Sequence, residues 1–154
     1  MKFKGVRYNI DGSIKHCLFC DFCSKTQFKN LLHDDDLCVA FQPLKTAGVQ
    51  HILVVPKHHI KTVKEFSSGE WIDLAMHMGQ VGRDLLEFFA QEQSRTLEDE
   101  NLRMLYHRPP FNSIDHLHLH CIELPLLNKR CVLKYSKEKF YCVEHSTVVK
   151  NMER

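Results

Sequence analysis

The 154-residue sequence lacks an apolar run long enough to cross a membrane and lacks a strong excess of either charge. Its 21 Lys and Arg residues against 19 Asp and Glu give a formal net charge of +2, too small to indicate a concentrated basic surface. The composition therefore neither indicates nor excludes a nucleic-acid partner. The basic N-terminal stretch also lacks the apolar run of a signal peptide. We expect an intracellular protein, cytoplasmic or nuclear, without a membrane segment.

Internal repeats, low-complexity segments and interdomain linkers are missing as well. With 44% hydrophobic and 26% charged residues, the composition is typical of one globular domain. Residues 1–15 are polar, contain the turn pair Asp11-Gly12 and show no periodicity. They predict a flexible N-terminal arm, followed by a single domain over residues 16–154.

Cysteine is present in an odd number, which argues against a disulfide framework: Cys17, Cys20, Cys23, Cys38, Cys121, Cys131 and Cys142. Cys17 and Cys20 form a CxxC pair whose spacing lets both sulfurs face one ion. Two buried thiols explain the same pattern equally well. Cys20 and Cys23 form a second, overlapping pair.

The most informative stretch is His116-Leu117-His118-Leu119-His120-Cys121-Ile122, where histidine alternates with apolar residues. Strict alternation predicts a half-buried strand with His116, His118 and His120 on one face. A single histidine on a strand is usually an ordinary surface or core residue, but three in register are harder to explain that way. A straight strand spreads them too far apart to chelate one ion, so they can divide the roles of nucleophile, proton carrier and metal ligand.

Periodicity and turn residues predict a mixed α and β domain. The predicted strands cover residues 30–33, 37–41, 50–55, 102–106, 116–122, 131–133 and 140–142. Ser67 and Glu70 resemble a capping box that starts a long helix, and a short helix is predicted from Glu144. Gly79 and Gly82 in the long helix indicate close packing, and His77 is predicted to be exposed.

The aspartate triplet Asp34-Asp35-Asp36 lies between the first two predicted strands. It does not begin an EF-hand-like spacing of oxygen ligands. We interpret it as a solvated hairpin tip.

Several motifs together resemble those of the histidine-triad (HIT) superfamily, in its Hint-like branch. These are the HxHxH run followed by two apolar residues, the strand from His51 that ends in Pro56-Lys57-His58-His59, the CxFC element at Cys17, and Arg108-Pro109-Pro110-Phe111 before Ser113. They occur in the family's order over residues 17–145. The resemblance implies an α+β HIT-like fold: an antiparallel sheet of about five strands, one long helix, a short C-terminal helix and a homodimer.

The same resemblance implies a hydrolase that cleaves AMP from an amine or a related leaving group. His118 would attack the α-phosphorus and form a nucleotidyl-histidine, which water then cleaves. His120 would donate a hydrogen bond to a non-bridging phosphate oxygen. His51 would orient the nucleophile or pass a proton to the leaving group.

Further roles implied by the resemblance concern substrate binding. Ser113 would contact the phosphate and His107 the leaving group, and an adenine pocket would be formed by Leu18, Phe19, Phe22, Phe41 and Leu44. One position departs from the family's pattern: Pro43 stands where an aspartate commonly holds the ribose hydroxyls. Gln42 is the candidate substitute.

Zinc-binding HIT proteins complete the CxxC pair with two histidines, and here the corresponding residues are His59 and His116. Together with Cys17 and Cys20 they would fill a zinc tetrahedron, which makes the expected zinc structural.

One different class of function and two other reactions within the enzyme class remain open. The chain could be a zinc-stabilised nucleotide-binding or interaction module with little turnover, an option favoured by Pro43. Alternatively, it could remove AMP from nucleic-acid ends as aprataxin does, or cleave dinucleoside polyphosphates.

Overall fold

The computed structural model describes residues 4–25 and 29–154. Within them, one six-stranded sheet has the order β3-β4-β5-β7-β6-β8, and every neighbouring pair is antiparallel. Its strands are β3 (Leu31–Asp34), β4 (Cys38–Phe41), β5 (Gln50–Pro56), β6 (Leu102–His107), β7 (Leu119–Glu123) and β8 (Cys142–Glu144). The helices are α1 (Leu18–Ser24), α2 (Ile72–Glu92), α3 (Lys129–Lys134) and α4 (His145–Met152). This arrangement confirms the predicted α+β class.

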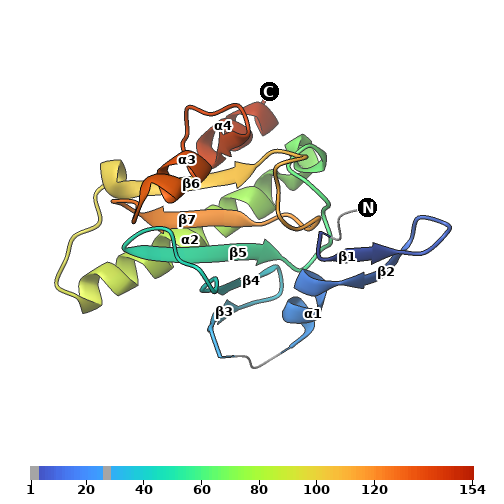
Figure 1. The fold of residues 1–154 in the computed structure, drawn as a ribbon, viewed down its shortest axis with the longest axis horizontal. Helices are drawn as coiled ribbons and strands as arrows, with labels where there is room; N and C mark the ends of the chain where they lie inside the picture. Colours follow the sequence, from blue (N-terminus) through green and yellow to red (C-terminus); the bar gives the residue numbers. More distant parts are fainter. Residues whose placement is uncertain (1–3, 26–28) are drawn as a thin grey trace.

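The long helix α2 lies across one face of the sheet, and α1 with the N-terminal hairpin lies beside the β4–β5 end (Figure 1). The central strands β5 and β7 are almost completely buried because both of their faces are covered. Ile52 and Val54 pack in the cluster under α2, whereas Leu53 packs with Phe19 of α1. Strand alternation then places His51 and His120 on the face away from α2, since His120 pairs with Leu53 in register.

Helix α2 approaches β7 very closely at Gly82. A Cβ atom at this position would lie 2.3 Å from Cys121 Sγ, which confirms the close packing predicted from the glycines. The predicted capping box is wrong: the Ser67 hydroxyl donates to the Lys64 carbonyl, and two short 3-10 turns precede Ile72. Among the described helices, none is both long and apolar enough to span a membrane.

Three segments differ from the sequence-based expectation. Residues 131–133 belong to α3 and not to a strand, because the Asn128 side chain accepts from Cys131 N and caps a helix there. The last strand is β8, two residues later than predicted. The sheet has six strands, whereas the resemblance implies about five. The triad is paired as a strand only from Leu119 onward.

The N-terminal segment forms regular structure that its sequence does not predict. Strands β1 (Val6–Tyr8) and β2 (Ile14–Cys17) pair as an antiparallel hairpin, with Val6 opposite Cys17. Gly12 takes a φ of +83° in the turn. The first three residues of the predicted arm lie outside the described residues. The hairpin leads the chain directly into the CxxC pair.

Candidate active site and metal centre

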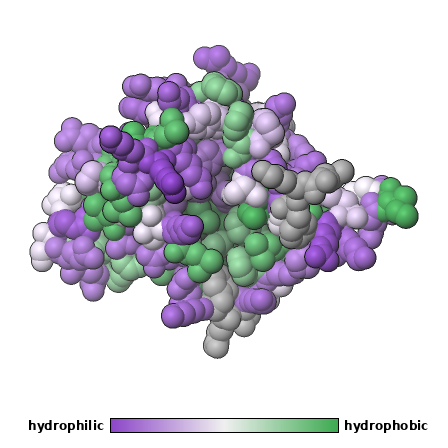
Figure 2. Space-filling view, viewed as in Figure 1, coloured by the Kyte–Doolittle hydropathy of each residue, from purple (hydrophilic) through white to green (hydrophobic). Residues whose placement is uncertain are grey.

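Three buried imidazoles form the centre of the site on the sheet face away from α2. His51 Nε2 and His120 Nδ1 are 3.0 Å apart, and the ring centroids of His118 and His120 are 5.0 Å apart. β5 supplies His51, while the end of the loop before β7 and β7 itself supply the other two. Figure 2 shows this face, where apolar side chains gather over the central strands and hydrophilic ones surround them.

Hydrogen bonds determine which nitrogen of each ring carries the proton. The backbone N–H of Ala47 donates to His51 Nδ1 at 3.1 Å, so His51 carries its proton on Nε2. The Nε2–H of His51 donates to His120 Nδ1, so the proton of His120 lies on its Nε2. His120 Nε2 is buried and has no hydrogen-bond partner among the described residues. The site therefore presents a buried N–H donor that the protein itself does not use.

His118 has the complementary arrangement. Its Nδ1–H donates to the His116 carbonyl at 2.8 Å, so Nε2 carries the lone pair. Burial lowers the pKa of His118 to about 4 and that of His51 to about 3, with Lys134 contributing to the second shift. Both imidazoles are neutral near pH 7. A neutral ring with an unprotonated Nε2 is the nucleophilic form.

The structure pairs the predicted catalytic histidines differently from what the resemblance implies. The hydrogen bond of His51 goes to His120, whereas the resemblance implies that His51 orients His118 or passes a proton to the leaving group. The Tyr135 ring packs against both His51 and His120, with centroids 5.4 and 5.1 Å away. Sequence reasoning missed Tyr135, which lies among the lysines of residues 134–139 and belongs to no recognisable motif.

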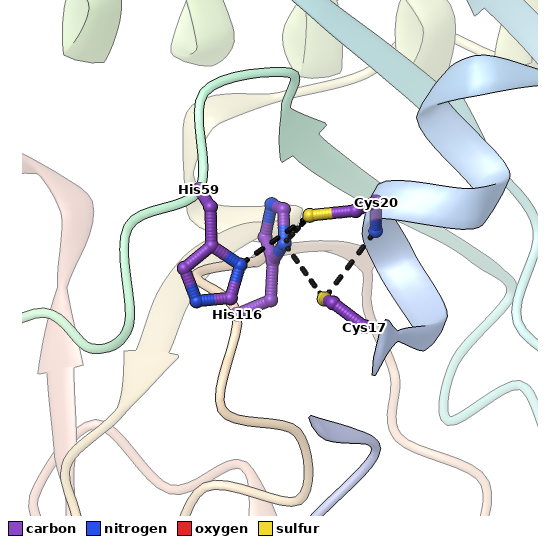
Figure 3. A group of neighbouring side chains, drawn as sticks. All are labelled: Cys17, Cys20, His59 and His116. Carbon is purple, nitrogen blue, oxygen red and sulfur yellow. Dashed lines mark hydrogen bonds between the residues drawn. The ribbon is translucent and has the colours of Figure 1, made fainter. Parts of the chain in front are cut away.

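The four predicted zinc ligands come together from separate segments (Figure 3). His116 Nδ1 lies 3.3 Å from Cys17 Sγ and 3.5 Å from Cys20 Sγ, and His59 Nδ1 lies 3.4 Å from Cys20 Sγ. A tetrahedron with bonds of roughly 2.0–2.3 Å has edges of roughly 3.3–3.8 Å, so the spacing fits a single zinc ion.

The orientation of His116 supports the same conclusion. Its Nε2–H donates to the Pro56 carbonyl at 2.8 Å, which directs the Nδ1 lone pair towards the two sulfurs. Burial lowers the pKa of His116 to about 4 and keeps the ring in its ligating, neutral form. The group Cys17, Cys20, His59 and His116 could therefore hold a metal ion.

Three of the five residues predicted for the adenine pocket contact one another. Phe19, Phe22 and Phe41 form an aromatic cluster with centroid separations of 5.4–6.0 Å, and the Phe19 ring lies 5.3 Å from that of His118. Leu18 is at the surface beside this cluster. Leu44 is 98% exposed and does not close the wall.

The remaining predicted substrate-binding residues differ in their environments. Ser113 is exposed in the loop that enters the triad, and Gln42 is exposed after β4. His107 is buried, and its Nε2–H donates to the Lys134 carbonyl at 2.8 Å. Sequence reasoning missed Asn112, whose buried amide donates to the Ile114 carbonyl and to Asp115, and so shapes this loop.

A cavity of about 290 Å³ opens beside His107. It is lined by His107, Phe111, Arg130, Leu133, Lys134 and Tyr141. The His107 ring contacts that of His120 at a centroid distance of 4.9 Å, so His107 connects this cavity to the triad, although His118 and His120 do not line the cavity.

Comparisons with known proteins identify the family of this chain. The family model described as "Scavenger mRNA decapping enzyme C-term binding" matches residues 16–136. The bifunctional adenosine 5'-phosphosulfate phosphorylase/adenylylsulfatase HINT4 of Arabidopsis thaliana is 40% identical over 125 residues, which are 80% of this chain and 81% of HINT4. Adenosine 5'-monophosphoramidase HINT3 of Mus musculus is 32% identical over 144 residues, covering 88% and 79% of the two chains.

Solved structures show the same fold. A HIT family hydrolase from Legionella pneumophila Philadelphia 1 superposes with a TM-score of 0.59 and 20% identity, covering 74% of this chain and 97% of the other. A protein named Hnt3 gives a TM-score of 0.65 with 19% identity, covering 86% and 76%. The motifs, the fold and these relatives together confirm the resemblance seen in the sequence: the chain belongs to the histidine-triad superfamily, in its Hint-like branch.

Proposed function

We propose that the protein is a nucleotide hydrolase that cleaves AMP from an amine or a related leaving group through a nucleotidyl-His118 intermediate. The observation that carries this proposal is the pairing of a lone pair on His118 Nε2 with an unpartnered N–H on His120 Nε2. The relatives named adenosine 5'-monophosphoramidase and adenylylsulfatase support an AMP-type substrate.

In the first step, a bond forms between His118 Nε2 and the α-phosphorus while the bond from phosphorus to the leaving nitrogen breaks. The leaving amine takes a proton from solvent. The imidazolium that forms on His118 is held through Nδ1–H by the His116 carbonyl. His120 Nε2–H donates to a non-bridging oxygen as charge develops there, while His51 keeps His120 in the required tautomer.

In the second step, a water oxygen bonds to phosphorus and the bond from phosphorus to His118 Nε2 breaks. The spare proton of the water returns to solvent. The products are AMP and the original neutral His118, ready for another cycle.

The test is turnover of a fluorogenic AMP phosphoramidate by the purified chain. We expect His118→Ala to abolish turnover because the substitution removes the nucleophile, while circular dichroism should show that the chain still folds. His58→Ala is the matched control, since it deletes an exposed imidazole outside the triad and should keep turnover near that of the wild type. Retained turnover in His118→Ala would refute the mechanism.

We also propose that Cys17, Cys20, His59 and His116 hold a structural zinc ion. Four protein ligands complete a tetrahedron and leave no open position for substrate or water. When bound, the ion would tie the segment before α1 to the loop after β5 and to the chain entering β7. The support is the mutual spacing of the ligand atoms and the second hydrogen bond of His116.

We assign the substrate contacts to residues near the triad and to the cavity beside His107. The cluster Phe19, Phe22 and Phe41 would hold the adenine ring, Ser113 the phosphate, and the cavity beside His107 the leaving group. Arg130 and Lys134 in that cavity favour an acidic leaving group. Gln42 would contact the ribose in place of the family's aspartate.

A nucleotide-binding module with little turnover is the second candidate, favoured by Pro43 at the position that commonly contacts ribose. AMP binding by the wild-type chain without turnover of any AMP phosphoramidate would favour this candidate. Removal of AMP from nucleic-acid ends would instead require binding of a 5'-adenylated oligonucleotide.

Finally, we propose a homodimer built on α2, whose Met76 and Phe88 side chains are large, apolar and more than half exposed. A dimer mass by sedimentation, reduced to a monomer mass in Phe88→Glu, would support this interface. A monomer mass for the wild type would contradict it. We further propose a reducing compartment such as the cytoplasm or nucleus, because the odd number of cysteines and the proposed zinc ligands Cys17 and Cys20 suit reduced thiols.

A further inference from the structure

A second group of potential metal ligands lies on the opposite face of the sheet and shares no residue with the first group. It consists of His33 on β3, Asp35 in the turn, Cys38 on β4 and His77 on α2. One ligand atom of each residue lies within 4.8 Å of all the others. Asp35 therefore does not behave as part of a solvated hairpin tip, and His77 is not simply exposed.

Asp35 is the centre of this group. Its Oδ2 lies 2.6 Å from His33 Nε2 and 2.7 Å from His77 Nε2, and Cys38 Sγ lies 4.0 Å away. Its Oδ1 accepts from the backbone N–H groups of Leu37 and Cys38, so the turn holds the carboxylate in position. One oxygen thus maintains the turn while the other faces the two imidazoles and the thiol.

We propose that His33, Asp35, Cys38 and His77 form a second zinc site, which fastens the edge hairpin β3–β4 to α2. One thiolate, one carboxylate and two imidazoles are all donors that zinc accepts, and four protein ligands make a closed, structural site. The proposal is independent of the nucleotide chemistry, because these residues pack on the α2 side of the sheet.

The observed distances are close to those that zinc requires. Tetrahedral edges are roughly 3.3 Å between nitrogen or oxygen ligands and roughly 3.5 Å to sulfur. An ion would therefore move the imidazoles away from Asp35 and draw the sulfur inward, by roughly half an ångström each. His33, Asp35 and His77 remain about one third exposed, which leaves a path for the ion to enter.

The charges also suit a divalent cation. Burial alone would raise the pKa of Asp35, but hydrogen bonds from His33 and from backbone N–H groups hold it well below its usual range. Burial and the nearby carboxylate raise the pKa of Cys38 to about 12, so its thiol keeps a proton until a cation displaces it. Zinc bound to one thiolate, one carboxylate and two neutral imidazoles would form a site without net charge.

The adjacent aspartates provide a matched pair for the experiment. The side chains of Asp34 and Asp35 are 28% and 27% exposed, but Asp34 pairs with Lys57 at 2.7 Å and does not belong to the group. Asp35→Asn keeps an oxygen to accept from the turn and removes the anionic ligand. His77→Gln is the second test variant, at a partly exposed helix position that tolerates substitution.

The experiment is zinc stoichiometry of the full chain, measured after the metal has been stripped under reducing conditions and zinc added back. We expect the wild type and Asp34→Asn to bind the same number of ions, and Asp35→Asn and His77→Gln to bind one fewer per chain. This difference does not depend on whether the Cys17 site is filled. Equal stoichiometry in all four proteins would overturn the proposal and leave a hydrogen-bonded cluster only.

Cobalt gives an independent readout in the Cys17→Ser/Cys20→Ser protein, where the first group has lost both sulfurs. Tetrahedral Co²⁺ bound through Cys38 should produce ligand-field bands together with a charge-transfer band from a single thiolate. The further substitution Asp35→Asn should abolish this spectrum. Absence of the spectrum in the double-serine protein would contradict the proposed site.

Discussion

The hydrogen bond from His51 to His120 allows the stability loss in His51→Ala to be predicted. The imidazole of His51 is 1% exposed, accepts from Ala47 N and donates to His120 Nδ1. Its removal leaves two buried polar groups unpaired and creates a cavity. We expect a loss of about 2–5 kcal/mol in the free energy of unfolding.

The effect on catalysis should appear in kcat rather than in KM. Without His51, His120 is no longer restricted to the tautomer with its proton on Nε2, so the donor to the phosphate oxygen is lost in much of the population. Loss of one such donor costs roughly 10²–10³ in kcat. Tyr135→Phe is the control, since it keeps the ring against His120 and should change kcat little.

Two assays separate this explanation from general destabilisation. Imidazole ¹⁵N chemical shifts should report a proton on Nε2 of His120 in the wild type and a mixture of tautomers in His51→Ala. Steady-state kinetics below the unfolding temperature should show the fall in kcat. A His120 that carries its proton on Nδ1 in the wild type, or an unchanged kcat in His51→Ala, would refute the reasoning.

Three further predictions concern stability. Burial holds the pKa of His51 at about 3 and that of His145 at about 4, below the usual value of about 6.5, so the unfolded chain binds more protons. The unfolding temperature should therefore be constant above about pH 6.5 and fall as the pH decreases towards 4; a flat profile would contradict these shifts. Zinc chelation should lower the unfolding temperature of the wild type but change that of Cys20→Ser less, as differential scanning fluorimetry can measure. Gly82→Ala should lower the free energy of unfolding in urea by about 1–3 kcal/mol because its Cβ would meet Cys121. Gly12→Ala is the comparison, since its added Cβ meets no atom within 4 Å and introduces only backbone strain at a φ of +83°.

The sequence pattern predicted most strands and the long helix because each carries a clear period. The pattern failed where a segment is too short to show a period. The apolar triplet at residues 131–133 fits either one helical turn or a short strand, and the side-chain cap from Asn128 selects the helix. The three-residue strand Val6–Tyr8 is too short to show alternation, so its hairpin could not be predicted.

The candidate site was predictable in its residues but not in its connections. Alternation places His118 and His120 on one face, and the CxxC pair indicates a metal site. The partner of His51 depends on the register between β5 and β7, which pairs His51 with Ile122 and Leu53 with His120. Register is a property of two strands together and cannot be inferred from either one.

The second cluster shows a further limit of sequence reasoning. His33 and His77 come from a strand and a helix that are distant in the chain, and no ligand spacing connects them. Only the packing of α2 on the sheet brings His77 to Asp35. A sequence motif therefore could not distinguish this aspartate from its two neighbours.

The central claim is that His118 Nε2 forms a covalent bond to the α-phosphorus. The most direct test mixes the purified chain with a stoichiometric amount of an AMP phosphoramidate, quenches the reaction within one turnover and locates the nucleotidyl group by peptide mass spectrometry. We predict AMP on His118 in the wild type and no adduct in His118→Ala. Hydrolysis without any adduct, or an adduct on another residue, would contradict the mechanism.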